Sequence, residues 1–534
     1  KRIAHIFSLI VLLSIVSFPQ AWEVIQGDIT SDRTLTSNRT YLLRGFVRVQ
    51  APAVLTIQPG TIIYGENTTQ GTLIIKPGAR INANGTAARP IVFTSEFARI
   101  GSTKAPVPGD WGGLIVLGNG ILNVPGGTAS IEGPGDTYGG TNANDNSGTI
   151  RYVRIEYSGI AFSLNNEINS LTMGGVGAGT TIEYVQVSYA NDDAFEWFGG
   201  NVNAKYLVAY RTLDDDFDTD FGYNGKLQYL VALRDPRIAD VSGSNSFESD
   251  NDGTGSTNSP LTSPTWWNVT LIGPSQAATD TINALYRRGM HLRRNSQNKI
   301  SNALIVGWRT GILLDGNRTI SGAIASTPTM WVRNSIIAGA TTRATDTTAA
   351  AGAIITPNTW FTGSNGRILA AASDAQLTAP FNLASPNFLP LAGSPALTGG
   401  ATPPNDGFFD VTATHVGAFG ATNWMANWTN FNPVNYPVST KENSVAVENF
   451  YLAQNYPNPF NPSTQISFTL AKRSNVTLKV YNSLAQEVAE IVNGNLIEGN
   501  HTINFDASGL SAGVYFYQLR TSDFTSTKKM TLLK

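Results

Sequence analysis

The chain has 534 residues, a formal net charge of −2 and only 14% charged residues. Its length exceeds that of one ordinary domain and predicts two or three domains, or one elongated repeat architecture. The balanced charge excludes a global field that would attract nucleic acid. The absence of cysteine excludes disulfides, cysteine zinc sites, thiol nucleophiles and a lipid-modified cysteine.

Residues 1–21 are predicted to be a secretory signal peptide. Lys1 and Arg2 open the chain, an apolar run follows, and small or polar residues lead to an expected cleavage near Ala21. The apolar run is too short to span a membrane with ease, and no other segment of the sequence looks transmembrane.

Residues 22–430 are predicted to form a parallel β-helix. Between residues 40 and 100, short β-rich runs alternate with Pro-Gly or Asn-Gly turns and show no helical period. Further on, one strand motif recurs after 22 and then 23 residues, at Tyr184, Tyr206 and Tyr229. A repeat of this length that is built from strands alone is typical of a β-solenoid.

A second family of strand-like runs lies between the first, and its alternation predicts which side chains face outward, because residues i and i+2 share one face of a strand. The predicted inward ladder is Phe195, Phe217, Phe247, Met290 and Ile312, with Trp197, Thr219, Ser249, Leu292 and Leu314 beside it. The predicted outward grid has one column of Glu196, Asp218, Glu248 and His291 and also includes Asp216, Asp220 and Asp250. Like charges at these spacings repel, so a cation, raised pKa values or neighbouring bases should offset them.

Calcium binding is the first of three hypotheses for this acidic grid. Clustered carboxylates suit a hard cation. The stretch from Asp216 to Asp220 resembles the start of an EF-hand loop, but its glycine stands one place late and its twelfth position would be Leu227, so an EF-hand is rejected. Calcium remains the candidate cofactor. The candidate metal ligands are Asp216, Asp218, Asp220, Glu248, Asp250 and Asp252.

Catalysis is the second hypothesis, because paired carboxylates on a β-helix face suit acid and base chemistry at a glycosidic bond. The candidate catalytic residues are Glu196, Asp218, Glu248 and His291. The candidate ligand-binding residues are Arg293 and Arg294, for acidic sugars, and Trp266 and Trp267, of which one is expected to be exposed.

The third hypothesis assigns the grid no ligand. Residues 287–299 contain four arginines, one lysine and one histidine, and no acid. The acidic block then simply pairs with this basic block across coils, or is a solvated face.

Three segments of the middle region carry a resemblance to known proteins: GTIRYVRIEYSG, DDAFEWFGG and FESDND. They resemble an uncharacterised family of bacterial surface β-helix proteins. Residues 386–400 and 415–424 look like closing turns, and this ending resembles other secreted right-handed β-helix proteins. Pectate lyases and polygalacturonases share that general fold, but no catalytic motif of theirs is matched here, and the fold alone does not fix the function.

The C-terminal region contains a linker and a small domain. Residues 431–447 are rich in Pro, Asn and Ser, as linkers are. Residues 448–534 contain alternating strand runs that predict an immunoglobulin-like β-sandwich.

The motifs of this small domain resemble the C-terminal sorting domain of the type IX secretion system. They are NYPNPFNPSTQISFTL (455–470), VYNSLAQEVAEI (480–491), FDASGLSAGVYFYQL (505–519) and KKMTLLK (528–534). The matching residues include Pro457, Asn458, Pro459, Phe460, Gly513, Lys528 and Lys529. Ala485 stands where the family usually has Gly.

The resemblance implies a Gram-negative bacterium of the Bacteroidetes/Chlorobi group. It also implies recognition by the type IX secretion machinery, export across the outer membrane, removal of the domain, and release or attachment to a surface glycolipid. The alternative is an adhesion module that the mature protein retains.

Together these features predict an all-β protein, a right-handed parallel β-helix followed by a β-sandwich, that is secreted or attached to the outer face of the outer membrane. The expected function is binding of extracellular polysaccharide or another surface partner without catalysis. One alternative is a polysaccharide lyase or glycoside hydrolase that uses the outward carboxylates. Another is a structural, self-associating surface fibre.

Overall fold

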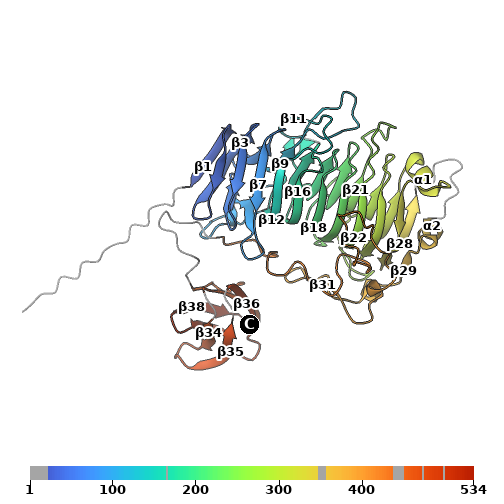
Figure 1. Ribbon diagram of the computed structural model, residues 1–534. Helices are drawn as coiled ribbons and strands as arrows, with labels where there is room; N and C mark the ends of the chain where they lie inside the picture. Colours follow the sequence, from blue (N-terminus) through green and yellow to red (C-terminus); the bar gives the residue numbers. More distant parts are fainter. Residues whose placement is uncertain are drawn as a thin grey trace, which may run out of the picture. The chain divides into compact units, whose positions relative to one another are not determined.

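The computed structural model describes residues 22–163, 166–346, 357–436, 450–471, 474–496 and 499–533, in two compact units, residues 1–441 and 442–534 (Figure 1). The predicted signal peptide and residues 437–447 of the predicted linker lie outside the described residues. Among the helices of the described part, none has the length and apolar character needed to cross a membrane.

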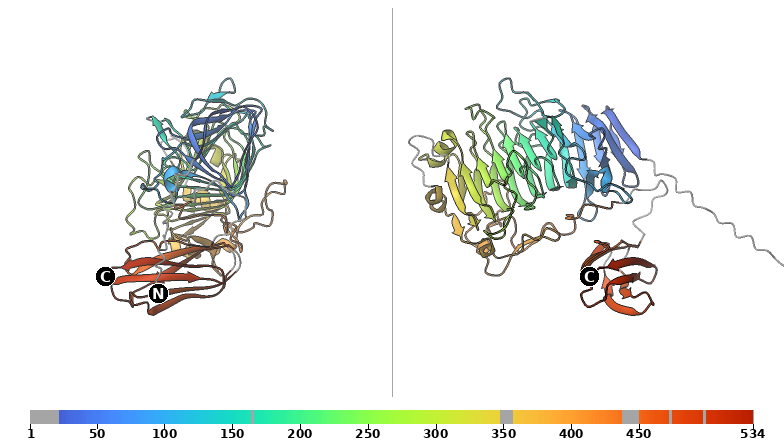
Figure 2. Two further views of the ribbon diagram at one scale, coloured as in Figure 1. Left: turned by 90° about the vertical axis from the view of Figure 1, so that its left-hand side faces the viewer. Right: turned by 180° about the vertical axis from the view of Figure 1, so that it is seen from behind.

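The first unit is a parallel β-helix, as predicted: each coil adds strands to three parallel sheets around one interior (Figures 1 and 2). The first sheet contains β2 (Arg33–Leu35), β4 (Val54–Ile57), β7 (Arg80–Asn84), the first halves of β12 (Gly148–Glu156), β16 (Thr181–Ser188), β18 (Asn203–Tyr210), β20 (Lys226–Leu233), β22 (Thr265–Ile272) and β24 (Lys299–Val306), and finally β26 (Trp331–Arg333).

The second sheet contains the first parts of β1 (Glu23–Ile29) and β3 (Thr40–Val49), then β5 (Ile62–Gly65), β8 (Ile91–Ser95), the second halves of the six long strands, β27 (Ile336–Ala338) and β29 (Arg367–Leu369). The third sheet contains the last parts of β1 and β3, then β6 (Thr72–Ile75), β9 (Gly113–Leu117), β15 (Leu171–Gly174), β17 (Phe195–Phe198), β19 (Phe217–Asp220), β21 (Asn245–Ser249), β23 (Arg288–Leu292), β25 (Thr310–Leu314) and β28 (Thr342–Asp346).

A single residue in the left-handed conformation turns the chain from the first sheet into the second. The residues at this corner are Tyr152, Tyr184, Tyr206, Tyr229, Asn268, Asn302 and Asn334, with φ between 49° and 63°. Asparagine tolerates this conformation, whereas a tyrosine there is uncommon. The four tyrosine rings stack with centroids 4.4, 4.2 and 5.0 Å apart, and this stacking supports the strained corners. The tyrosine that marks the repeat in the sequence is therefore a corner residue.

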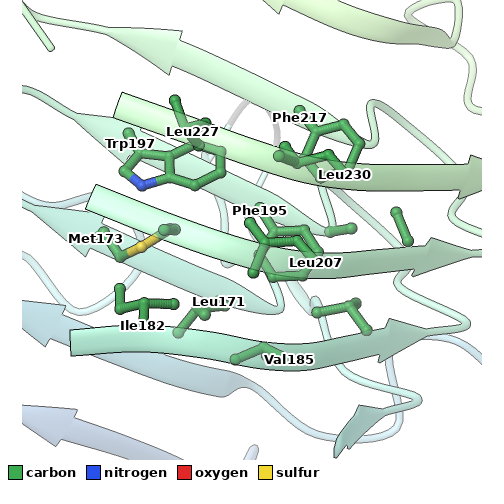
Figure 3. Packing of buried hydrophobic residues seen from close by; sticks show 14 of the residues in the cluster. Leu171, Met173, Ile182, Val185, Phe195, Trp197, Leu207, Phe217, Leu227 and Leu230 are labelled. Atoms are coloured by element: carbon green, nitrogen blue, oxygen red, sulfur yellow. The ribbon is translucent and has the colours of Figure 1, made fainter. Parts of the chain in front are cut away.

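The predicted inward ladder is confirmed. Phe195, Phe217, Phe247, Met290 and Ile312 pair in register on consecutive strands of the third sheet, and each is at most 1% exposed. Figure 3 shows Phe195 and Phe217 facing Leu207 and Leu230 of the second sheet across the interior. The outward side chains of the third sheet are consequently fixed in register from coil to coil.

Helical segments and short hairpins occupy the loops. The helices are α1 (Asn317–Ile324), α2 (Pro357–Gly363) and the 3₁₀ turns Glu96–Ala98, Ala372–Ala375 and Pro395–Leu397. The paired short strands are β10 (Ala129–Ser130) with β11 (Thr137–Tyr138), β13 (Ala161–Ser163) with β14 (Asn166–Glu167), and β30 (Leu377–Ala379) with β31 (Asn387–Pro390).

After the last coil the chain runs back along the outside of the β-helix (Figures 1 and 2). We call residues 399–436 the return segment. It bonds to the corner residue Asn302 at Ala401, packs Trp428 against Tyr152 and Tyr184, and ends with Tyr436 paired to the backbone of Ala98. The predicted closing turns at residues 386–400 and 415–424 are therefore not coils. Part of this region is an outer cover over the corner ladder.

The second unit forms two antiparallel sheets, which confirms the β-sandwich prediction. One contains β32 (Tyr451–Leu452), β33 (Ser463–Leu470) and β36 (Gly499–Asp506); the other contains β35 (Glu487–Leu496), β34 (Ser474–Tyr481), β37 (Gly513–Arg520) and β38 (Thr525–Leu532). Their apolar faces share one core that includes Phe460, Ile466 and Tyr517.

Candidate functional site

The outward column predicted for the third sheet lies in register, one residue per coil. Thr172, Glu196, Asp218, Glu248 and His291 are consecutive strand partners. Neighbouring coils stack about 4.8 Å apart, so these side chains lie close enough to interact.

The segment between β9 and β12 covers this column and closes a pocket of about 390 Å³. Its hairpin β10–β11 is held by Asp136, which accepts from Arg48 at 3.0 Å and from Lys76 at 2.5 Å. The pocket is lined by Ser130, Ile131, Glu132, Tyr138, Glu196, Phe198, Asp218, Asp220, Phe221, Asp250, Arg293 and Arg294. We call it the carboxylate pocket. Outward residues of the third sheet thus face a partly enclosed space rather than open solvent.

Asparagine and aspartate side chains form a polar ladder at the corner that leads into the third sheet. Asn169 accepts from the backbone N–H of Asp193 at 3.2 Å, Asp193 accepts from that of Asp215 at 2.8 Å, and Asp215 accepts from that of Asn245. Each ladder residue stands two positions before an inward residue, such as Asp193 before Phe195. This spacing is visible in the sequence and could have identified the polar ladder.

Two groups of carboxylates meet around this corner. Oxygen atoms of Asp193, Glu196 and Asp218 lie within 4.8 Å of one another, and so do those of Asp192, Asp193 and Asp214. Across the described ranges, none of these five acids forms an ion pair with a side chain. Such oxygen-only groups suit a hard divalent cation, so the residues fit calcium.

The cation ligands predicted from the sequence overlap with these groups only at Asp218. Glu196 was predicted as a catalytic residue only, and Asp192 and Asp193 were not predicted as ligands, because the sequence does not show that the corner brings their oxygens close together.

Glu132 reaches the same place from the covering segment. Asn169 donates to Glu132 Oε1 at 2.7 Å and also to Glu196, and Glu132 is hydrogen-bonded to Glu196. Two carboxyl groups in this contact share a proton. No sequence pattern pointed to Glu132, because it comes from a loop outside the repeat.

Burial dominates the titration of the pocket acids. It raises the pKa of Glu132 to about 7, against the hydrogen bonds from Glu196 and Asn169. Burial, followed by the charges of neighbouring carboxylates, raises the pKa values of Glu196 and Asp218 well above their usual range and that of Asp220 to about 7. Perturbed carboxyl groups in a pocket are typical of functional sites.

The far end of the column is neutralised. Glu248 accepts from His291 Nδ1 at 3.1 Å and pairs with Arg293, while Asp315 meets His291 Nε2 at 3.0 Å. Asp250 bridges Arg293 and Arg294, with both distances at 2.7 Å. Although burial opposes it, the hydrogen bond from His291 and the Arg293 charge hold the pKa of Glu248 below its usual value. In this half of the grid, acids and bases do pair across coils.

Several predicted site residues lie elsewhere. Asp216 was expected in the outward row, but it is fully buried and pairs with Arg234 at 3.0 Å. Asp252 accepts from the backbone of Thr254 and Ser256 and so caps its own loop.

The expectation that one tryptophan of the 266–267 pair is exposed is wrong. Trp266 is 1% exposed and packs on Phe247 in the interior. Trp267 is 9% exposed because Phe409 of the return segment lies against it, with ring centroids 6.0 Å apart.

The predicted sorting residues come together in the second unit. The backbone of Phe460 pairs with Thr531 and Leu533 of the terminal strand, and Asn458 accepts from the backbone of Thr531 at 2.8 Å. Gly513 pairs in register with Leu532, and Lys528 and Lys529 belong to the same strand. Pro457 and Pro459 flank Asn458 on an exposed surface. The first and last motifs of the domain therefore form one continuous region.

Comparisons with known proteins give two matches. Residues 27–377 match the family described as pectate-lyase like beta helix domain, and residues 454–532 match the secretion system C-terminal sorting domain. No curated protein and no solved structure matches the chain.

Proposed function

This chain belongs to the pectate-lyase-like β-helix family and carries a type IX sorting domain that directs it to the cell surface or outside, and we propose that it binds an extracellular polysaccharide in the carboxylate pocket without turning it over. The observation that carries the proposal is the pocket itself. It combines carboxyl groups that have no cationic side-chain partner among the described residues, such as Glu196 and Asp218, with the aromatic walls of Tyr138, Phe198 and Phe221. Its volume of about 390 Å³ falls within the range of ligand sites.

A divalent cation is the cofactor that this arrangement favours. Asp193, Glu196 and Asp218 offer oxygen atoms close enough to share one ion, and Asp193 also belongs to the second group with Asp192 and Asp214. An ion there would offset the repulsion among these carboxylates. Calcium is the candidate because its coordination sphere tolerates irregular carboxylate geometry.

The test of binding is a glycan array probed with the full chain, followed by affinity measurements for each retained polysaccharide. We expect binding that Asp218→Asn weakens and that Asp28→Asn, an exposed substitution on β1, leaves unchanged. Absence of any retained glycan, together with self-association of the chain, would contradict the proposal and favour a structural fibre.

Polysaccharide cleavage is the second candidate, and the contact between Glu132 and Glu196 favours it. A carboxyl group that stays protonated near neutral pH can act as a general acid, and Asp218, whose carboxyl oxygen lies within 4.8 Å of one of Glu196, is the candidate base once it is ionised. Cleavage would release reducing ends, or unsaturated products if the reaction is an elimination. Glu132→Gln and Glu196→Gln should then abolish product formation while Asp28→Asn retains it; a panel of polysaccharides that yields no product rejects this candidate.

A further inference from the structure

The charge and hydrogen-bonding capacity of the carboxylate pocket restrict the class of sugar that it takes. We infer that the pocket selects polysaccharides whose units carry a free ammonium group, that is, amino sugars without an N-acetyl group. This inference rests on the proposed function and gives it a substrate class.

Acids outnumber bases in the lining. Five carboxylates line the pocket, from Glu132, Glu196, Asp218, Asp220 and Asp250, against the two guanidinium groups of Arg293 and Arg294. Both arginines already pair with Asp250, and Arg293 also pairs with Glu248. The arginines are therefore engaged by protein carboxylates, which removes the basis for expecting them to bind acidic sugars.

One oxygen atom of the lining lacks a hydrogen-bond partner in the described part of the chain, and it is an acceptor. Asp218 Oδ1 is a buried atom with no hydrogen-bond partner among the described residues, and the carboxylate lines the pocket. A buried polar atom without a partner is unfavourable, so a ligand that supplies a donor to this oxygen gains affinity.

An ammonium group meets this requirement. It offers three donors and no acceptor, and its positive charge favours the ionised form of the neighbouring carboxyl groups, which can then only accept. A uronate would place a further acceptor and a further negative charge among these acids, and an N-acetyl group would replace the cation with a neutral amide. The ring of the sugar would lie against Phe198 and Phe221, whose centroids are 5.8 Å apart, and aromatic faces also attract cations.

The experiment compares three hexasaccharides of equal length: glucosamine, N-acetylglucosamine and galacturonate. Binding of each to the full chain is measured by calorimetry, with the metal chelated and again with calcium added. We expect the glucosamine hexamer to bind at least about tenfold tighter than its N-acetylated counterpart, since one charge-assisted hydrogen bond is worth that much. Galacturonate should bind most weakly in chelator.

Variants separate this inference from the proposed function. Asp218→Asn should remove most of the preference for glucosamine while Asp28→Asn keeps it, and added salt should reduce it because a charge pair is screened. Equal or tighter binding of the N-acetylated or galacturonate hexamer in chelator overturns the inference and leaves polysaccharide binding intact. Added calcium should reduce the preference, because it competes with the ammonium group for Asp218. Failure of all three hexamers, with no other glycan retained on the array, overturns both.

Discussion

At the scale of single residues, Asp218 illustrates how a site can weaken the fold that carries it. Its carboxylate has a buried oxygen without a partner and lies within 4.8 Å of oxygens of Asp193 and Glu196. Function-related groups of this kind commonly lower stability.

We therefore expect Asp218→Asn to stabilise the ligand-free protein by about 1 kcal/mol, because it replaces, at constant size, a carboxyl group whose ionised form is opposed by burial and by neighbouring acids. Denaturant unfolding of the chelator-treated protein measures this. Asp28→Asn should cause no change, and a loss of stability in Asp218→Asn would show that its charge is compensated in the free protein.

Stabilisation by calcium is expected to depend on the carboxylate of Asp218. Millimolar calcium is expected to raise the melting temperature of the natural protein and to raise that of Asp218→Asn by less, because the variant offers a weaker ligand set. Differential scanning calorimetry tests this. A melting curve that calcium leaves unchanged, with Asp218→Asn and Glu248→Gln also neutral, would reject the cation hypothesis.

The pocket acids should make the protein more stable in mild acid than at neutral pH. Burial raises the pKa values of Glu132 and Asp220 to about 7, and that of Asp214 to about 6, above their values in the unfolded chain. Between those unfolded values and pH 7 the folded state holds protons that the unfolded state has lost, so this stabilisation is complete below about pH 4 and disappears as the pH rises through 7.

Without divalent cations, the free energy of unfolding should accordingly increase by a few kcal/mol from pH 8 to pH 5. The low pKa of Asp252, about 2, acts only in stronger acid and does not mask this window. Thermal melts across that range measure the trend, and Glu132→Gln should flatten it. A melting temperature that falls on acidification to pH 5 contradicts the electrostatics described for the pocket.

At the scale of elements, the corner ladder and the return segment depend on each other. The indole of Trp428 is 1% exposed and lies nearly perpendicular to the rings of Tyr152 and Tyr184, with its centroid 5.9 Å from each. The corner tyrosines are left-handed and strained, so the cover that packs on them also holds them in place.

Trp428→Ala should destabilise the β-helix by about 3–5 kcal/mol, the usual cost of emptying a buried tryptophan site. Trp428→Phe keeps an aromatic contact and should cost clearly less. Chemical unfolding followed by tyrosine fluorescence distinguishes them. Equal stability of the alanine variant and the natural protein would mean that the return segment contributes nothing to the coils.

The face of the strand on which each side chain lies was predictable from the sequence. Which distant parts of the chain cover that face was not. The order of Phe195, Glu196 and Trp197 fixes which side chains point inward, because alternation along a strand is a local property. The same alternation predicted that one tryptophan of the 266–267 pair is exposed. This prediction was wrong because Phe409, far along the sequence, covers Trp267. Glu132 was not predicted as a site residue for the same reason: a loop outside the repeat brings it to Glu196.

At the scale of the whole molecule, the chain combines a β-helix that carries the candidate site with a sorting domain that gives its destination. The sorting unit has its own core, in which Phe460 is 2% exposed and joins the first motif to the terminal strand. Small domains have little stability to lose.

Phe460→Ala should therefore unfold the sorting unit, at a cost of about 3–5 kcal/mol, and prevent display of the protein outside the cell. Cell fractionation measures the location, and thermal melting shows whether the β-helix transition is retained, as we expect. Phe460→Leu is the matched control and should be exported. Normal export of the alanine variant would separate recognition from the fold of this unit.

The return segment also changes how the β-helix loses its structure. In an open stack of coils each coil touches only its neighbours, so the two ends can fray independently. Here one stretch of chain is fastened at Asn302, in β24, and at Ala98 and Glu156, beside β8 and in β12, the last through Tyr436 at 2.6 Å. Separation of the coils between β12 and β24 must also strain or break these contacts. We therefore expect the return segment to couple the unfolding of these coils, which lie far apart in the stack, more tightly than stacking of neighbours alone would.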